Sequence, residues 1–371
     1  GVGCRRPAEQ ILPFGEQPEG YVHGVPQYFA TARPTRTGAV PVVVESNEGR
    51  PTKVEGNSKH PDSNGGTDLH TQASILDLYD PDRAQQFRQS GEIVRRADAL
   101  AELKKVFASS LPDGGAETAF LFEPGNSPSR ARMLRAVKSK LPQANFYTHD
   151  PLDLGIHVRA ATKAFGKPKP VRPRFHFDKA KVVLSLDCDF IGSEDDAHRH
   201  IRDFTKGRKL NGGNPEMSRL YVVEALMTQT GANADHRLRS KLSDVYGFAG
   251  AIAGRVGVDG FSDGGISDVK WVEKCVEDLK KAGKGALVVA GHRQPMAVHV
   301  LAHAMNQTLG SLGETIELLP ADDLGVPVAG SLAELKSTIG GVDTLVMLGG
   351  NPVYDAPSDL GWSEAQGKVK T

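Results

Sequence analysis

The chain has 371 residues with 45 basic and 45 acidic side chains, so its formal net charge at pH 7 is zero. This length predicts two or three domains, and the balanced charge argues against a nucleic-acid-binding protein, which normally carries a basic excess. The three cysteines (Cys4, Cys188 and Cys275) are far apart, so thiols alone cannot assemble a structural zinc site or an iron–sulfur cluster.

The N-terminal quarter of the chain predicts an arm and a small β-rich region. Residues 1–38 are rich in proline, glycine and arginine without periodicity, which indicates an extended arm. A strand at 39–46, a turn at 47–50 and a second strand at 51–55 predict a hairpin. A short helical stretch is expected at 74–79.

From about residue 97 the sequence alternates between amphipathic helices and apolar strands. Helices are expected at 97–109, 127–141, 195–206, 268–282 and 295–309, and strands at 119–122, 181–186, 219–224, 286–290 and 344–348. Ser331 and Glu334 form a capping box that begins one more helix, whereas the Pro- and Lys-rich segment 163–173 predicts a connector. This alternation predicts an α/β fold with parallel sheets covered on both faces.

Two of the predicted strands end in turns that resemble ligand sites. The strand at 344–348 is followed by Gly349, Gly350 and Asn351, at the edge where open α/β sheets bind ligands. The alternative is that a loop between a strand and a helix needs such residues for its turn. After the strand at 286–290, Arg293 stands close to a predicted helix N-terminus and could meet an anion there.

Histidines occur at metal-like spacings in two predicted helices. His299 and His303 share a helix face, but no third ligand accompanies them, so packed or surface histidines are favoured over zinc. In the segment 193–200 acids and imidazoles crowd together. We interpret Ser193 as the N-cap of a helix whose first turn carries the acids.

The sequence contains no recognisable nucleophile or nucleotide motif. It lacks a P-loop and a G-x-G-x-x-G loop after a strand, and its one G-x-S-x-G pattern, at 260–264 (GFSDG), does not follow a predicted strand. Cys188 lies between Asp187 and Asp189, whose charges are expected to raise the pKa of the thiol rather than activate it.

Several segments together resemble the molybdopterin oxidoreductase superfamily. Residues 48–57 (EGRPTKVEGN), His60-Pro61 and residues 79–83 (YDPDR) are similar to its opening domain. Members with a cluster carry a cysteine between the last two elements, where this chain reads GGTDLHTQ at 65–72. Residues 221–224, 231–238 and 349–352 are similar to segments around its pterin cofactor. The resemblance implies five vestigial pterin-pocket positions, namely Glu224, Asp235, Gly349, Gly350 and Asn351.

Within that superfamily the chain is most similar to the N-terminal, cofactor-free half of the large iron–sulfur (B) subunit of alternative complex III. Residues 4–7 (CRRP), 28–32 (YFATA) and 72–83 (QASILDLYDPDR) carry this resemblance. It implies an arm at 1–38 and a β-rich remnant of a cluster-binding domain at 39–90. An incomplete α/β domain is then expected at 91–180 and 286–371, with a nested Rossmann-like domain at 181–285.

The same resemblance implies a cellular context. Twin-arginine export would place the chain on the periplasmic side of the inner membrane, with Cys4 as a candidate lipid anchor. No cofactor is expected in this chain. Iron–sulfur clusters would lie in the C-terminal half of the subunit, and haem in a multihaem cytochrome partner beside quinol-binding membrane subunits.

Three functional hypotheses follow from the sequence. The first is a non-catalytic scaffold and docking domain of this respiratory complex, which has lost the metal ligands but kept the framework. The alternative is a molybdopterin- or nucleotide-binding oxidoreductase in which Glu224, Arg293 and Asn351 hold the cofactor. A third is a protein that binds an unrelated small ligand in the same cleft.

Overall fold

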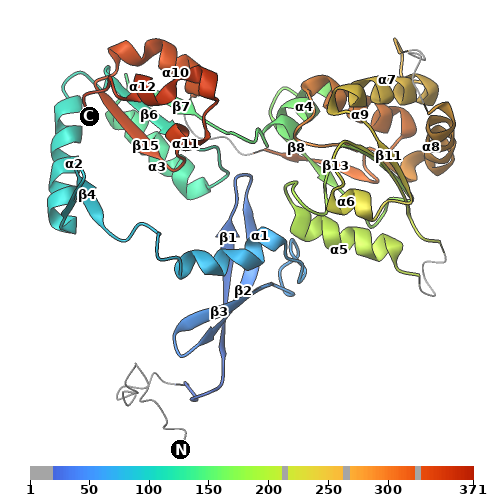
Figure 1. Cartoon of the computed structure of the whole chain (residues 1–371), viewed down its shortest axis with the longest axis horizontal. Coiled ribbons are helices and arrows are strands. Elements are labelled where there is room, and N and C mark those ends of the chain that lie inside the picture. Colours follow the sequence, from blue (N-terminus) through green and yellow to red (C-terminus); the bar gives the residue numbers. More distant parts are fainter. Residues whose placement is uncertain (1–19, 211–215, 262–267, 322–326) are drawn as a thin grey trace, which may run out of the picture.

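The computed structural model describes residues 20–210, 216–261, 268–321 and 327–371. They form a three-stranded antiparallel sheet, which we call the N-terminal sheet, and two α/β units (Figure 1). Each unit is built on a four-stranded parallel sheet. We call these the outer sheet (order β14-β7-β6-β15) and the inner sheet (order β11-β10-β9-β12). The predicted α/β class with parallel sheets is confirmed.

The N-terminal sheet has the order β1-β2-β3 and contains the predicted hairpin. Its strands are β1 (Gln27–Pro34), β2 (Ala39–Asn47) and β3 (Arg50–Gly56). Val40, Val42 and Val54 form its small core. Residues 27–34 lie in the segment expected to be an extended arm, yet they pair with β2 along its length. Most of β1 is exposed, so its sequence carries no alternation that would have indicated a strand.

Four short elements connect this sheet to the outer unit. They are α1 (Leu69–Ala73), the 3-10 helix η1 (Ser74–Leu78), and the hairpin strands β4 (Phe87–Gln89) and β5 (Glu92–Val94). Asp68 begins α1 by accepting a hydrogen bond from the backbone N–H of Thr71 at 2.8 Å. η1 confirms the short helical stretch expected at 74–79.

The outer sheet combines strands from two distant parts of the chain. Its strands are β6 (Thr118–Phe122), β7 (Asn145–Thr148), β14 (Gly330–Ser331) and β15 (Thr344–Leu348). Its helices are α2 (Arg96–Ser110), α3 (Pro128–Lys140), α10 (Leu332–Thr338), η4 (Ile339–Gly341), α11 (Pro352–Asp355), η5 (Ser358–Leu360) and α12 (Trp362–Gln366). Phe120, Phe122 and Phe146 pack with Leu134 of α3, while Trp362 of α12 lies in the cluster formed on Ala119 and Leu121. The capping box at Ser331 is confirmed at the start of α10.

The inner sheet is buried on both faces, which explains its continuous apolar strands. Its strands are β9 (Val182–Leu186), β10 (Arg219–Glu224), β11 (His236–Arg239) and β12 (Ala286–Ala290). The helices of this unit are α4 (Ile156–Ala164), α5 (Ala197–Arg208), α6 (Gln229–Ala232), η2 (Leu242–Asp244), α7 (Val245–Val256), α8 (Val269–Ala282), η3 (Gly283–Gly285) and α9 (Met296–Leu309). Leu184 and Val223 face α7, α8 and α9, whereas Val183 and Val222 face Phe204 of α5.

Two features of the inner unit differ from the sequence prediction. Strand β12 pairs with β9 along its whole length, so it belongs to the inner sheet although the domain boundary was expected at residue 285. The segment 163–173, expected to be a connector, contains the end of α4 and much of β8 (Val171–Phe175). β8 pairs antiparallel with β13 (Ile316–Pro320), so the inner unit extends on both sides of the expected range 181–285.

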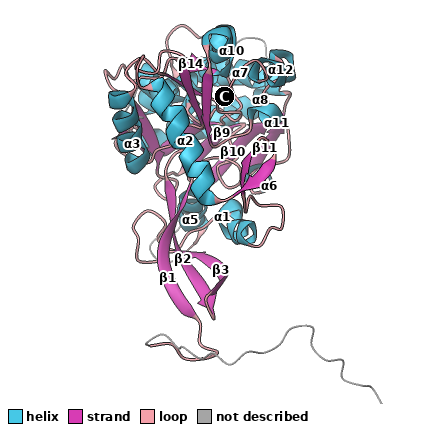
Figure 2. Ribbon diagram, turned by 90° about the vertical axis from the view of Figure 1, so that its left-hand side faces the viewer, coloured by secondary structure: helices cyan, strands magenta, loops and turns pink. Residues whose placement is uncertain are grey.

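The turn between β1 and β2 contacts both α/β units. Arg36 forms an ion pair with Asp150, which follows β7 of the outer sheet. On the inner side, the backbone carbonyl of Thr37 accepts a hydrogen bond of 3.5 Å from Arg172 of β8. Figures 1 and 2 show the N-terminal sheet below the two units, with this turn pointing between them. The N-terminal sheet therefore links the two units.

Candidate functional site

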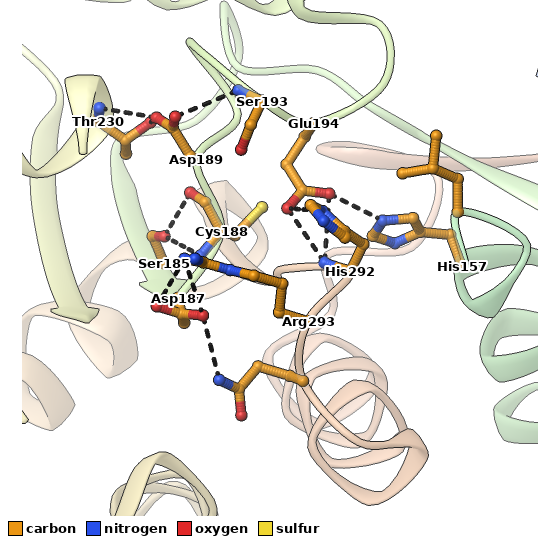
Figure 3. A network of polar contacts seen from close by, with 12 residues as sticks. His157, Ser185, Asp187, Cys188, Asp189, Ser193, Glu194, Thr230, His292 and Arg293 are labelled. Atoms are coloured by element: carbon orange, nitrogen blue, oxygen red, sulfur yellow. Dashed lines mark hydrogen bonds and ion pairs between the residues drawn. The ribbon is translucent and has the colours of Figure 1, made fainter. Parts of the chain in front are cut away.

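The carboxyl edge of the inner sheet gathers several of the polar side chains that the sequence singles out. Strands β9, β10 and β12 are parallel, so the residues at and after their carboxyl ends meet at one edge. Open α/β sheets bind ligands at this edge. Figure 3 shows that the charged groups there face other polar groups of the same chain.

Asp187 is the first residue after β9, and it is buried with a positive φ of 52°. Its carboxylate lies 3.3 Å from the guanidinium of Arg293 and accepts a hydrogen bond of 3.3 Å from the amide of Gln294 (Figure 3). Burial raises the pKa of Asp187, and the charge of Arg293 only partly offsets this effect. Arg293 was predicted to meet an anion, and in this structure it meets the carboxylate of Asp187.

Glu224 ends β10, and other groups of the chain also occupy its carboxylate. It accepts hydrogen bonds from Thr228 Oγ1 at 2.6 Å and from Arg237 Nε at 2.5 Å. Gly231 packs so closely against it that an added Cβ would lie 1.7 Å from Glu224 Oε1. The glycine at 231 therefore makes room for a side chain of this chain.

A second buried network centres on Glu194, in the loop between β9 and α5. Its carboxylate lies 3.1 Å from His157 Nε2 and 2.9 Å from His292 Nδ1, and it accepts a 3.0 Å hydrogen bond from the backbone N–H of His292 (Figure 3). Burial raises the pKa of Glu194, but the hydrogen bonds from the two histidines outweigh it and lower the pKa. The hydrogen bond to Glu194 raises the pKa of His292. This network joins α4 to the loops after β9 and β12.

A small cavity lies beside the Glu194 network. Its volume is about 40 Å³, and Cys188, Phe177 and His200 are among its lining residues. Pockets that bind drug-sized ligands have about 300–1,000 Å³, so a pterin or a nucleotide does not fit this cavity as it stands. Burial, followed by the neighbouring carboxylates, raises the pKa of Cys188, in the direction expected from the sequence. Burial lowers the pKa of His200 to about 3.

The start of α5 differs from the prediction. Ser193 is not its N-cap, because the helix begins at Ala197 and Asp196 occupies the N-cap position. Asp189 fixes the preceding loop by accepting hydrogen bonds from the backbone N–H of Ser193 at 3.1 Å and from Thr230 Oγ1 at 2.8 Å. Glu194, Asp195 and Asp196 were expected in the first helical turn, but they precede the helix. Glu194 therefore lies in a loop, where its side chain is buried.

The five predicted pterin-pocket residues lie in three separate places. Glu224 lies at the carboxyl edge of the inner sheet, as described above. Asp235 lies at the opposite, amino edge, where it accepts hydrogen bonds from the backbone N–H of Leu220 at 2.7 Å and from Arg208 at 2.6 Å. Gly349, Gly350 and Asn351 follow β15 of the outer sheet and are exposed. Asp235 is thus separated from Glu224 by the length of β10.

The histidine pair on α9 is packed, as the sequence favoured. The ring of His299 contacts His157 edge-on with centroids 5.1 Å apart, and His303 lies 5.2 Å from the ring of Phe165. Burial lowers the pKa of His299 to about 3 and that of His303 to about 4. Both histidines are therefore neutral parts of the core at pH 7.

Sequence reasoning missed the two histidines that bind Glu194. His157 lies 37 residues before Glu194 on a helix that was not predicted, and His292 lies 98 residues after it. The nearest signal was the position of His292 at the carboxyl end of a predicted strand, beside Arg293.

Metal-binding groups, membrane spans and similar proteins were each looked for in this chain. Within the described ranges, no three His, Cys, Asp or Glu side chains are arranged to hold a metal ion. Nor does any helix of that part of the chain have the length and apolarity that a membrane span requires. Cys4, the lipidation candidate, lies outside the described residues. The chain matches no protein-family model, and no curated protein matches it.

Proposed function

We propose that this chain is a non-catalytic scaffold and docking domain of a quinol-oxidising respiratory complex of the alternative complex III type. The observation that carries the proposal is the carboxyl edge of the inner sheet, where groups of the chain itself occupy the ligand positions. Asp187 faces Arg293, and Glu224 faces Arg237. Both carboxylates are buried, whereas Arg237 is partly exposed and Arg293 is exposed, so removing a partner should cost less than the roughly 3–5 kcal/mol typical of a fully buried pair. A cofactor that displaced these partners would have to overcome such costs.

The segment that aligns with the superfamily's cluster-binding region supports the same proposal. At Gly66 an added Cβ would lie 2.2 Å from the backbone oxygen of His198, so this segment packs directly against the first turn of α5. Asp62 reinforces the contact by binding His198 at 3.3 Å and Arg199 at 2.9 Å. Close packing between modules fits a scaffold in which the region keeps a structural role.

Exposed apolar side chains in the first third of the described chain support docking to a protein partner. A groove of about 320 Å³ lies between β3 and η1, and its lining includes Leu76 and Tyr79, which are 65% and 52% exposed. Further exposed apolar side chains nearby in sequence are Tyr28, Phe29, Leu69, Leu78, Phe87, Ile93, Leu100 and Leu103. Exposed apolar side chains that gather in one place commonly mark interaction sites, and the groove lined by Leu76 and Tyr79 is such a place.

The resemblance supplies the context of the proposal. The partners would be a multihaem cytochrome and quinol-binding membrane subunits, reached on the periplasmic side after twin-arginine export. Iron–sulfur clusters would belong to the C-terminal half of the subunit and haem to the cytochrome partner. Cys4 would carry a lipid anchor, which alone gives only marginal membrane binding. The molybdopterin-oxidoreductase-like architecture is part of the same proposal.

The composition of the complex that purifies with the native, full-length subunit tests this proposal. We expect haem and iron in fixed proportion to the subunit. Stoichiometric molybdenum, or fluorescent pterin released from this chain on denaturation, would overturn the proposal and favour the alternative, a molybdopterin- or nucleotide-binding oxidoreductase. We also expect Leu76→Glu with Leu78→Glu to release partner subunits, while the control Leu242→Glu, at a 43% exposed position of the inner unit, retains them.

A further inference from the structure

A polar pocket with an excess of hydrogen-bond donors lies between the loop that follows the N-terminal sheet and the inner unit. Its volume is about 170 Å³. The loop before Gly65 forms one wall, α5 the second, and the end of β8 the third. The lining residues are Pro61, Asp62, Ser63, Asn64, Arg174, His176, Asp178, Arg199, Arg202, Asp203 and Lys206. None of these residues belongs to the carboxyl edge of the inner sheet.

The cationic side chains of the pocket converge from two elements. Arg199, Arg202 and Lys206 are spaced three and four residues apart on α5, so they share one face of the helix. Arg174 comes from β8. The arrangement therefore presents three guanidinium groups and one ammonium group to the same space.

Two of these guanidinium groups have a buried nitrogen without an acceptor. Arg199 is 4% exposed, and two of its nitrogens bind Asp62 and Asp196 at 2.9 and 2.8 Å. Its Nε, like the Nε of Arg174, is buried and finds no hydrogen-bond partner among the described residues. Buried donors normally have partners, so these two nitrogens keep donor capacity that the described residues do not use.

Carboxylates also line the pocket, but they do not pair with all of its hydrogen-bond donors. Asp62 is engaged by His198 and Arg199, and Asp203 lies 3.6 Å from Lys206. Burial and then the nearby Asp178 raise the pKa of Asp203.

We propose that this pocket binds a tetrahedral oxyanion of the phosphate or sulfate class. Guanidinium groups bind such anions through paired charge-assisted hydrogen bonds, and Arg174 and Arg202 both line the pocket. The volume is smaller than that of typical sites for drug-sized ligands, which fits a single oxyanion group rather than a nucleotide. The group can belong to free phosphate or to a phospholipid headgroup. The proposal does not depend on the scaffold function.

Calorimetric titration of the full chain with inorganic phosphate, at ionic strength held constant with sodium chloride, tests the proposal. We expect one saturable site, for which sulfate competes. Arg202→Gln with Lys206→Gln should weaken binding about tenfold or more, because the variant loses charge-assisted hydrogen bonds to the anion. Both side chains are exposed, so the variant should fold normally.

A matched control removes two positive charges elsewhere. Lys280→Gln with Lys281→Gln, on the exposed end of α8, should bind phosphate as the wild type does. An equal loss in both double variants, or no saturable binding by the wild type, would overturn the proposal.

Sedimentation with phosphatidylglycerol vesicles distinguishes a phospholipid headgroup from a free anion. Vesicle binding that Arg202→Gln with Lys206→Gln abolishes supports a headgroup, and phosphate binding without vesicle binding supports a free anion.

Discussion

The two parallel sheets end in carboxyl edges of opposite character. At the inner sheet, β9 and β12 are buried over their whole length, and acidic side chains at the edge pair with basic or polar groups of the chain. At the outer sheet, β15 becomes exposed towards its end, and Leu348 and Tyr354 are 45% and 88% exposed. The inner edge is closed at β9 and β12 by groups of the chain, whereas the outer edge is exposed at β15.

Glycine serves a different purpose at each edge. Gly231 and Gly291 lack positive φ, but an added Cβ would lie 1.7 Å from Glu224 Oε1 and 1.9 Å from the backbone oxygen of Asp187. Gly349 and Gly350 have φ of 76° and 72°, and an added Cβ would come no closer than 3.3 Å to its nearest neighbour. The inner glycines are needed for packing and the outer ones for their turn. A strand followed by glycine is therefore not, by itself, a ligand site.

Among substitutions of these glycines, the largest effect is expected for Gly291→Ala. The added methyl group meets the backbone of Asp187 and Cys188, which cannot move without disturbing β9. We expect a loss of about 3 kcal/mol in the free energy of unfolding, measured by urea denaturation. Gly247→Ala is the control, because a Cβ added to this helical glycine of α7 would meet no atom of another element within 4 Å. It should be neutral or stabilising by up to about 1 kcal/mol. Equal stability of the two variants would show that the inner edge is not tightly packed.

The next largest effect concerns the Glu194 network. Glu194→Gln keeps the shape of the side chain but removes the charge that holds His157 and His292. We expect a loss of about 2 kcal/mol at pH 6, together with a fall in the pKa of His292 measured by NMR titration. Glu102→Gln, which breaks an exposed pair with Lys105 on α2, should change stability by less than about 1 kcal/mol. An unchanged His292 pKa would contradict the network.

Buried neutral histidines make the inner unit sensitive to acid. The pKa of His303 is about 4 in the folded chain, against 6.5 for an ordinary histidine, so between these values the unfolded chain binds more protons. Stability is therefore lost as the pH falls from about 6.5 to about 4. At pH 5 the loss due to His303 alone is about 2 kcal/mol relative to pH 7.

Replacing this histidine tests the argument. His303→Leu should reduce the difference in unfolding free energy between pH 7 and pH 5 by about 2 kcal/mol, because leucine takes up no proton. The comparison is made within each protein, so any change in packing at pH 7 cancels. A variant that keeps the wild-type pH dependence would assign the acid sensitivity to other groups, such as His200 or His299.

The sequence predicted the elements whose apolar pattern is strong. β9, β10, β12 and β15 are short, almost entirely apolar strands, and α8 and α9 repeat their apolar residues every three to four positions. The helix α7 was missed because Gly247, Gly250 and Gly254 lower its helix propensity. In the structure its small residues pack closely against neighbouring helices, and tertiary contacts outweigh the propensity.

The candidate site was less predictable because its pairs join distant residues. The sequence around Glu194 does not show that it pairs with His292. Nor does the sequence around Asp187 show that it pairs with Arg293, which lies more than 100 residues later in the chain. Strand order decides these contacts. Since β12 was expected to belong to another domain, the sequence could place Arg293 near an anion but could not identify the anion as Asp187.

The smallest effect is expected at the outer edge, and it gives the most direct comparison of the two sheets. Leu186 and Leu348 are the last residues of β9 and β15, and they are 0% and 45% exposed. Leu186→Ala should cost about 3 kcal/mol or more, as truncation of a buried leucine does, whereas Leu348→Ala should cost about 1 kcal/mol or less. Urea denaturation of both variants measures the difference. If Leu348→Ala cost as much as Leu186→Ala, the outer edge would have to be covered in solution, and the contrast between a closed and an open edge would fail.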